Sequence, residues 1–516
     1  MCGATLRRLT ASALCKFDKD FMSDATGEMQ FAVGKTAGIE KLGFTLRALL
    51  EAYPELAVIQ FDAVSAFNNI SRERVLQRVR DVAPHLLAYA AAFLTIPSHA
   101  MLRKTDGTIS LLRITAGLDQ GDPLSPFLFA LALPLPEIRN KLRNLLAVTA
   151  PDRAPSLLAG LMSYLDDLSL VIPATIAEEA RTIVVGELAH VGLAVNEDKS
   201  LVYTASGECP EGCGDWWANA ARHDGFLLCG SPHDANLANM DFDSFGDSVV
   251  MPIGNAEFVQ DFLAGYVGKV EKFVAAVRAI PVHAQPGEPA VQVANLLLRH
   301  CASSKASHLL RALPTAVVLE TAQRIDQVIL DGFADINALG AAENSSAKSL
   351  IQMPVARGGL GLRSLSVVAD AAHVAAWLHC AHSVSVAIGD VVPAMHDWSA
   401  AALPCQQHVH RAVQRMFNDY EVDVLSLCEL DWAAVPRSER AKQQRTISRA
   451  FWDVEYDRWS ATAPEGLLQT SLSGSSRGGR PAAGEWMFAI PVSQNLTLSD
   501  DAYRFAIRLR LGCRTQ

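Results

Sequence analysis

The sequence predicts an α+β protein, with an antiparallel sheet and helices on one face of it in the first half and a helical second half. Two observations predict the sheet. Residues 56–62 form a short apolar run that ends on an acid, and residues 161–172 hold two apolar runs on either side of Asp166 and Asp167, as in a hairpin. The third observation is that alanine and leucine recur with helical spacing over 255–400, which indicates a helical bundle.

The other elements of the first half follow from periodicity and turn residues. A helix is predicted over 36–52, where apolar residues fall on one face, and another over 174–191. A strand is expected over 109–115, and a helix over 126–146 after a Gly-Asp-Pro turn. Residues 192–199 read as a turn into a further strand. This order of strands and helices is typical of a sheet with helices on one face.

Composition limits the class of protein. At 516 residues, with 50% hydrophobic and 19% charged residues, the chain should form several globular subdomains. Its formal net charge of -10 argues against a basic, non-specific nucleic-acid binder, but not against an enzyme that confines positive charge to one cleft. The cysteines follow no disulfide framework and the N-terminus lacks a signal-peptide core, which favours an intracellular protein of the nucleus or cytoplasm. The apolar runs are too short to predict a membrane span.

Three carboxylates carry the strongest chemical signal. Asp62 ends one predicted strand, and Asp166 and Asp167 occupy the turn of the predicted hairpin. Acids at adjoining strand ends can converge on one site, where phosphoryl transfer uses two divalent cations about 3.5–4 Å apart. Carboxylates are suitable ligands for such cations, and unpaired acids inside apolar strands are otherwise costly. An exposed hairpin tip without function is the alternative for the adjacent pair.

Several motifs resemble those of reverse transcriptases in order and spacing. Tyr164-Leu-Asp-Asp167 resembles the tyrosine-x-Asp-Asp box, and Phe61-Asp62 with Ala66-Phe-Asn68 resembles the first acidic motif. The segment 117–126 (Gly-Leu-Asp-Gln-Gly-Asp-Pro-Leu-Ser-Pro) is similar to the second motif, and 192–199 to the fourth. Residues 251–254 and 354–363 are similar to segments that follow the polymerase core in non-LTR retrotransposons. The chain thus resembles the reverse transcriptase domain of such an element.

This resemblance implies a right-hand polymerase fold, with an antiparallel palm sheet and a helical thumb. The implied division is 1–55, partial fingers; 56–205, palm; 206–254, irregular connection; 255–400, helical thumb-like region; 401–463, C-terminal helical region with a basic run; and 464–516, linker and C-terminal tail. The implied activity is RNA-directed DNA polymerisation with an RNA template, a DNA primer and deoxynucleoside triphosphates.

The resemblance also assigns roles residue by residue. Asp62, Asp166 and Asp167 match the acids that bind Mg²⁺ or Mn²⁺. Lys199 matches a lysine proposed to protonate or neutralise the leaving pyrophosphate. Residues matched to nucleotide and template contacts are Gln120, Gly121 and Tyr164, and Phe67 matches an aromatic gate that excludes the 2′-hydroxyl of a ribonucleotide. In isolation Phe67 would be read as core packing and Lys199 as a solvated side chain.

Basic residues for the triphosphate and for nucleic acid are few. Arg7 and Arg8 are the early cations that could meet a triphosphate, because the chain opens at what resembles the end of the fingers motifs and is expected to lack their beginning. Impaired nucleotide binding is the expected result. The clearest candidates for contacts with the nucleic-acid backbone form a run, which could equally be a solvated helix face: Arg437, Arg440, Lys442, Arg445 and Arg449.

Two other functions compete with a reverse transcriptase. One is a catalytically inactive remnant that folds as a scaffold and at most binds RNA. The other is an RNA-dependent RNA polymerase, against which Phe67 and the Tyr164-Leu165 start of the acidic box argue. Cysteine and histidine groups at 209–229 and 405–410 offer possible zinc ligands, but without the paired spacing of a zinc finger.

Overall fold

The computed structural model describes residues 2–149, 160–228, 250–285, 288–388, 403–422, 442–463 and 498–511. The chain divides into two compact units. The first consists of Met1–Asn239, Ser248–Phe258 and His379–Val392, and the second of Met240–Asp247, Val259–Leu378 and Pro393–Gln516.

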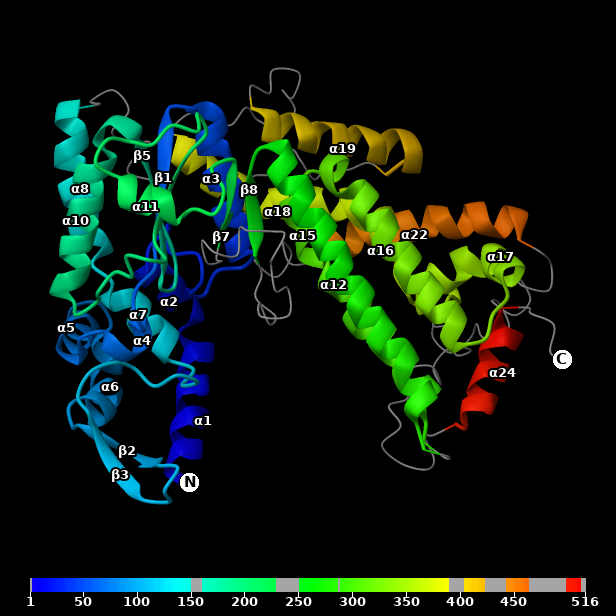
Figure 1. Cartoon of the computed structure of the whole chain (residues 1–516), viewed down its shortest axis with the longest axis horizontal. Coiled ribbons are helices and arrows are strands. Elements are labelled where there is room, and N and C mark those ends of the chain that lie inside the picture. The colour runs from blue at the N-terminus through cyan, green and yellow to red at the C-terminus, as the bar shows by residue number, and fades with distance from the viewer. Residues whose placement is uncertain are drawn as a thin grey trace. The chain divides into compact units, whose positions relative to one another are not determined.

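A four-stranded antiparallel sheet forms the centre of the first unit (Figure 1), in the order β4-β5-β1-β6. Its strands are β1 Leu56–Phe61, β4 Leu161–Tyr164, β5 Asp167–Pro173 and β6 Leu201–Thr204. The predicted strand at 56–62, the predicted hairpin at 161–172 and the strand after 192–199 are therefore confirmed. Gln30 extends the sheet through a parallel bridge to Ser163 on β4.

Both faces of this sheet are covered, one by a helix and the other by a hairpin of two strands. The register places Phe61 and Tyr203 on opposite faces, because Val58 pairs with Tyr203 and neighbouring residues alternate. Phe61 packs edge to face against Trp216, with ring centroids 5.3 Å apart, and Tyr203 packs against Phe226, 5.1 Å away. One face is thus covered by α11 (Gly214–Asn219), and the other by the hairpin of β7 (Gly225–Leu228) and β8 (Met251–Gly254).

The segment 206–254, expected to be irregular, therefore contains a helix and two paired strands in its described part. Each element is short, with six residues in α11 and four in each strand. Such lengths show no clear hydrophobic period, and the two strands pair across a long stretch of sequence, so local patterns could not reveal them.

The first unit contains further helices. They are α1 Cys2–Phe17, α2 Lys19–Ala25, α3 Gly38–Ala52, α4 Ala66–Asn69, α5 Arg72–Val82, α6 Leu87–Leu94, α7 Ser125–Ala132, α8 Leu135–Thr149 and α10 Ala177–His190. The predicted helices over 36–52 and 174–191 are confirmed. The single helix expected over 126–146 is instead two, α7 and α8. Pro134 separates them, because proline disfavours helical backbone in the residue before it, and Leu133 is extended (φ -56°, ψ 138°).

The described part of the second unit is helical, as the alanine and leucine spacing predicts. Its principal helices are α12 Ala256–His283, which begins in the first unit, α13 Ala290–Leu297, α15 Ser307–Ala312, α16 Thr315–Ile336, α17 Ala341–Gln352, α18 Leu365–Ile388, which ends in the first unit, α19 Pro404–Tyr420, α22 Gln443–Thr462 and α24 Asp500–Arg510. Residues 500–510 were expected to form a tail, but α24 buries Tyr503 and Ile507, and Asp500 accepts a hydrogen bond from the Val291 backbone N–H at 2.9 Å.

One described helix, α18, is long and apolar enough to cross a membrane by length and composition. Its most apolar window is 61% buried inside the protein, as in the core helix of a soluble protein. The helix is weak evidence for a membrane span.

Candidate active site

The strand register brings the predicted acids to one end of the sheet. Phe61, the last residue of β1, pairs with Leu168 of β5, so Asp62 follows β1 where Asp167 begins β5. Asp166 lies in the tight turn between β4 and β5, beside Leu165, whose φ is 57°. Tyr164 ends β4, is half-buried and pairs with Asp167. The two acidic motifs, far apart in sequence, therefore adjoin through backbone pairing.

The pKa of the Asp166 carboxyl is raised above its ordinary value. Desolvation by the surrounding protein is the main cause, a hydrogen bond from its own backbone opposes it, and the negative charge of Asp62 adds to the rise. Asp166 is only partly covered by the protein and keeps an exposed surface, while Asp62 is half-buried. A cation beside the two carboxylates would stabilise their charged forms.

The three acids do not form a three-ligand metal group by themselves. Among the residues that the structure describes, no group of three or more His, Cys, Asp or Glu side chains is arranged to hold a metal ion. The charge of Asp62 acts on Asp166. Such a pair suits Mg²⁺, which is commonly bound by one or two carboxylates together with substrate phosphates.

The loop that carries Lys199 is tied to Asp62. The backbone N–H of Asp62 donates to Ser200 Oγ at 3.1 Å, and the Asn196 N–H donates to the Asp62 carbonyl at 2.7 Å. Asn219 of α11 donates to the Ser200 carbonyl at 2.7 Å. Lys199 is exposed on this loop. The supporting roles of Ser200 and Asn219 were not predicted, because only the folded loop brings them to Asp62.

Phe67 is half-buried and joins the first motif to the second. Its ring stacks on Phe129 of α7, with centroids 4.5 Å apart and an interplanar angle of 14°. Its carbonyl accepts a hydrogen bond from the Leu118 N–H at 2.7 Å. The ring is therefore held in place by packing while part of it stays open to solvent.

Two glycines shape residues 117–126, the second-motif loop. Gly117 has φ +77°, and an added Cβ would lie 2.3 Å from the Asn68 carbonyl oxygen. Both the backbone conformation and the lack of space for a side chain therefore require glycine at this position. Gly121 has φ +85° but open space around it, so its backbone conformation alone favours glycine. Gln120 and Gly121 are both exposed, as a contact with nucleotide or template would need.

Arg7, predicted to meet a triphosphate, forms ion pairs with two acids of the protein. Its Nη1 lies 2.5 Å from Asp119 Oδ2, and its Nε lies 2.8 Å from Asp122 Oδ2, both in the second-motif loop. Burial works to lower the pKa of Arg7, but the hydrogen bonds and charges of the two aspartates raise it overall. Arg8 is exposed. The sequence could not show that α1 lies against a loop more than a hundred residues away.

Arg72 is a second arginine of this region and was not predicted. It is buried, and its Nε donates to the Gly117 carbonyl at 2.9 Å while Nη2 donates to Ser98 Oγ at 3.2 Å. Arg72 begins helix α5 after the N-cap Ser71, a position that usually indicates an exposed side chain. Its contacts fix the start of the second-motif loop.

The predicted basic run is described only in part. Arg437 and Arg440 lie outside the described residues. Lys442 precedes α22, and Arg445 and Arg449 are exposed one turn apart on that helix, in the second unit. Phe451 and Trp452 next to them are buried and so belong to the core.

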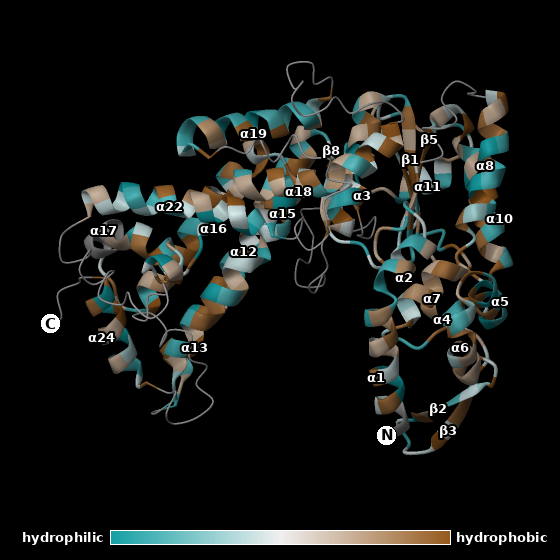
Figure 2. Ribbon diagram, turned by 180° about the vertical axis from the view of Figure 1, so that it is seen from behind, coloured by the Kyte–Doolittle hydropathy of each residue, from teal (hydrophilic) through white to brown (hydrophobic). Residues whose placement is uncertain are grey.

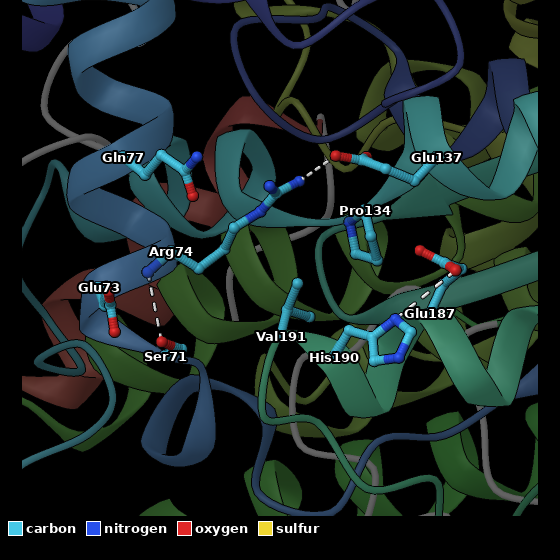
Figure 3. Close-up of a pocket in the computed structure, with 9 residues that line it drawn as sticks. All are labelled: Ser71, Glu73, Arg74, Gln77, Pro134, Glu137, Glu187, His190 and Val191. Carbon is cyan, nitrogen blue, oxygen red and sulfur yellow. Dashed lines mark hydrogen bonds and ion pairs between the residues drawn. The ribbon is translucent and has the colours of Figure 1, made fainter.

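A polar pocket of about 250 Å³ lies elsewhere in the first unit (Figure 3). It is lined by residues of α5, α8 and α10, among them Arg74 and Glu137, which form an ion pair at 2.5 Å. His190 and Glu187 also line it, and His190 Nδ1 lies 3.6 Å from Glu187 Oε1. None of the residues predicted for catalysis or substrate binding lines this pocket.

Comparison with known proteins gives distant matches to solved structures. No protein-family model matches this chain, and no curated protein matches it. It is similar to telomerase from Candida albicans in complex with a TWJ fragment of telomeric RNA, at 12% identity and a TM-score of 0.33, over 84% of this chain and 56% of that chain. Apo telomerase from Candida tropicalis matches at 12% identity and a TM-score of 0.28, over 64% and 55%.

A second Candida tropicalis telomerase structure, in complex with a TWJ fragment of telomeric RNA, matches at 11% identity and a TM-score of 0.28, over 79% of this chain and 56% of that one. The chain thus spans little more than half the length of these telomerases. TM-scores below 0.5 establish neither a shared fold nor a shared function. What the structure itself establishes is a mixed α and β chain in which a small antiparallel sheet carries the predicted acids at one end.

Proposed function

We propose that this chain is an RNA-directed DNA polymerase, the reverse transcriptase domain of a non-LTR retrotransposon, acting inside the cell. One observation carries the proposal. Asp62 of the first acidic motif and Asp166 of the Tyr-x-Asp-Asp box adjoin at the same end of the sheet, and the charge of Asp62 contributes to the raised pKa of Asp166. Perturbed acids that converge from separate motifs are typical of catalytic sites.

The proposed reaction extends a DNA primer on an RNA template. The primer 3′-hydroxyl attacks the α-phosphate of a deoxynucleoside triphosphate, a new phosphodiester bond forms, and pyrophosphate leaves. Asp62 and Asp166 would hold Mg²⁺ or Mn²⁺, with Asp167 beside them, and the bound metal would supply charge stabilisation for the hydroxyl and the leaving group. Lys199, exposed on the loop tied to Asp62, would neutralise or protonate the pyrophosphate.

Primer extension on an RNA template with the full chain, in Mg²⁺ or Mn²⁺, tests this function. Asp166→Asn keeps the shape of the side chain and removes its charge, and should lower extension by at least about a hundredfold. Asp81→Asn, an exposed acid near the end of α5, is the matched control and should leave extension unchanged. If the wild-type chain folds but never extends a primer, the inactive remnant is the correct alternative.

Sugar selection gives an independent test. Phe67→Val shortens the side chain that is proposed to clash with a 2′-hydroxyl, so ribonucleotide incorporation should rise relative to deoxynucleotide incorporation. An unchanged ratio in a folded variant would reduce Phe67 to a packing partner of Phe129.

A further inference from the structure

A hairpin between the first and second motifs exposes an apolar face. Strand β2 (Ser98–Arg103) pairs with β3 (Ile109–Ile114), and His99, Met101 and Arg103 lie directly opposite Arg113, Leu111 and Ile109. Neighbouring residues alternate between the two faces of a hairpin, so these six side chains share one face. We call it the outer face.

Large apolar side chains are exposed on both faces of the hairpin, and they are most exposed on the outer face. There Met101 is 77% exposed, Leu111 68% and Ile109 65%, against 50% for Leu102, 49% for Leu112 and 38% for Ile114 on the other face. Figure 2, in which hydrophobic residues are brown, shows this colour along β3. A cluster of large apolar side chains that is exposed to solvent often marks a surface that binds a partner.

The charge of the hairpin indicates what binds there. The hairpin segment, residues 98–114, is basic, although the whole chain has a formal net charge of -10. Its basic residues are Arg103, Lys104 and Arg113, and its one acidic residue is Asp106. Two copies of the outer face packed together would bring arginines near arginines, which disfavours self-association. The face therefore suits a partner that is anionic and also presents apolar surfaces.

The base of the hairpin is joined to the candidate active site through Arg72. This buried side chain donates to Ser98 Oγ on β2 and to the carbonyl of Ile114 on β3, at 3.2 and 3.4 Å. It also donates to the carbonyl of Gly117 in the second-motif loop. The base of the hairpin is thus held next to that loop.

We propose that the outer face of the β2–β3 hairpin binds single-stranded nucleic acid. The choice of occupant rests on the proposed function, in which this strand is the RNA template. A single strand exposes the faces of its bases, which aliphatic side chains such as Met, Leu and Ile can contact, while a duplex hides them in its stack. Arg103 and Arg113 lie four residues apart along the ladder, about 13 Å, and contact separate phosphates.

The test is the affinity of the full chain for a labelled single-stranded RNA, measured by fluorescence anisotropy without metal or nucleotide. Arg103→Ser with Arg113→Ser should weaken binding roughly tenfold at low salt and reduce the slope of log K against log salt by about 1.4. Met101→Ser with Leu111→Ser should weaken binding while keeping the slope, because these residues contact bases and not phosphates.

Matched controls and competing outcomes decide the proposal. Arg80→Ser with Arg143→Ser removes two exposed charges from helices of the same unit and should leave affinity unchanged. Equal losses in this control would overturn the proposal, and so would equal affinity for a duplex. If light scattering shows a dimer that the Met101 and Leu111 changes dissociate, with RNA affinity unmoved, the face is a self-association surface.

The failure of this proposal is distinct from the failure of the proposed function. If the chain binds RNA through the hairpin but extends no primer, the proposed binding surface is supported and the proposed polymerase function is refuted. If the chain extends primers but the substitutions in the hairpin leave its RNA affinity unchanged, the polymerase function is supported and the binding surface is refuted.

Discussion

Arg7 offers the sharpest test of how the second-motif loop is held. Arg7→Met keeps most of the apolar length of the side chain and removes its charge. Asp122, whose side chain is 6% exposed, would lose a cation 2.8 Å away, and the half-exposed Asp119 would lose one at 2.5 Å. The sequence predicts that Arg7 serves a triphosphate, whereas the structure predicts that it stabilises the fold.

The expected loss follows from these exposures. An ion pair with an exposed acid contributes at most about 1 kcal/mol, so Asp119 adds little. A buried acid that is left without the cation beside it costs about 1–3 kcal/mol. The free energy of unfolding of the first unit should therefore fall by about 2 kcal/mol, which lowers its Tm by roughly 4–8 °C.

Differential scanning calorimetry of Arg7→Met and Arg8→Met measures this loss. Arg8 is exposed, so its replacement should change stability by less than about 0.5 kcal/mol. Adding Asp122→Asn to Arg7→Met should recover part of the loss, since the unpaired buried charge is then removed. The reasoning is refuted if Arg7→Met keeps wild-type stability and only raises the KM for nucleotide, because Arg7 would then bind the triphosphate.

Three further predictions concern other positions. The pKa of Asp166 is raised in the folded protein, so ionisation of this carboxyl lowers the stability of the fold as pH rises through that pKa. Asp166→Asn should therefore raise the Tm at pH 7. Thermal melts at several pH values should show that this gain vanishes in acid. Gly117→Ala should destabilise the first unit by more than about 2 kcal/mol and Gly121→Ala by only about 1, since an added Cβ meets the backbone at the first position alone; urea unfolding compares them. Asp326 is buried and accepts hydrogen bonds from Ser364, Leu365 and Ser366, so Asp326→Ala should cost the second unit about 2–4 kcal/mol in urea unfolding, while the exposed Asp331→Ala should cost under about 0.5.

The sequence by itself determined the elements whose signal is local. The strand at 56–61, the hairpin around Asp166 and the helices over 38–52 and 177–190 follow from patterns of apolar residues within each segment. The motifs also identified the acids, and their positions at strand ends indicated that Asp62 and Asp166 would converge. Local patterns are enough to predict these features, because apolar residues recur along each segment with the period of the helix or strand that buries them.

Only the tertiary structure decided which partners the charged side chains found. Arg7 pairs with Asp119 across 112 positions, and Arg72 is buried against carbonyls of a distant loop. No local period encodes such contacts, since an arginine on a helix reads as exposed until another segment covers it. The cover of the second sheet face by β7 and β8 is of the same kind, because pairing of short strands depends on what the rest of the chain brings together.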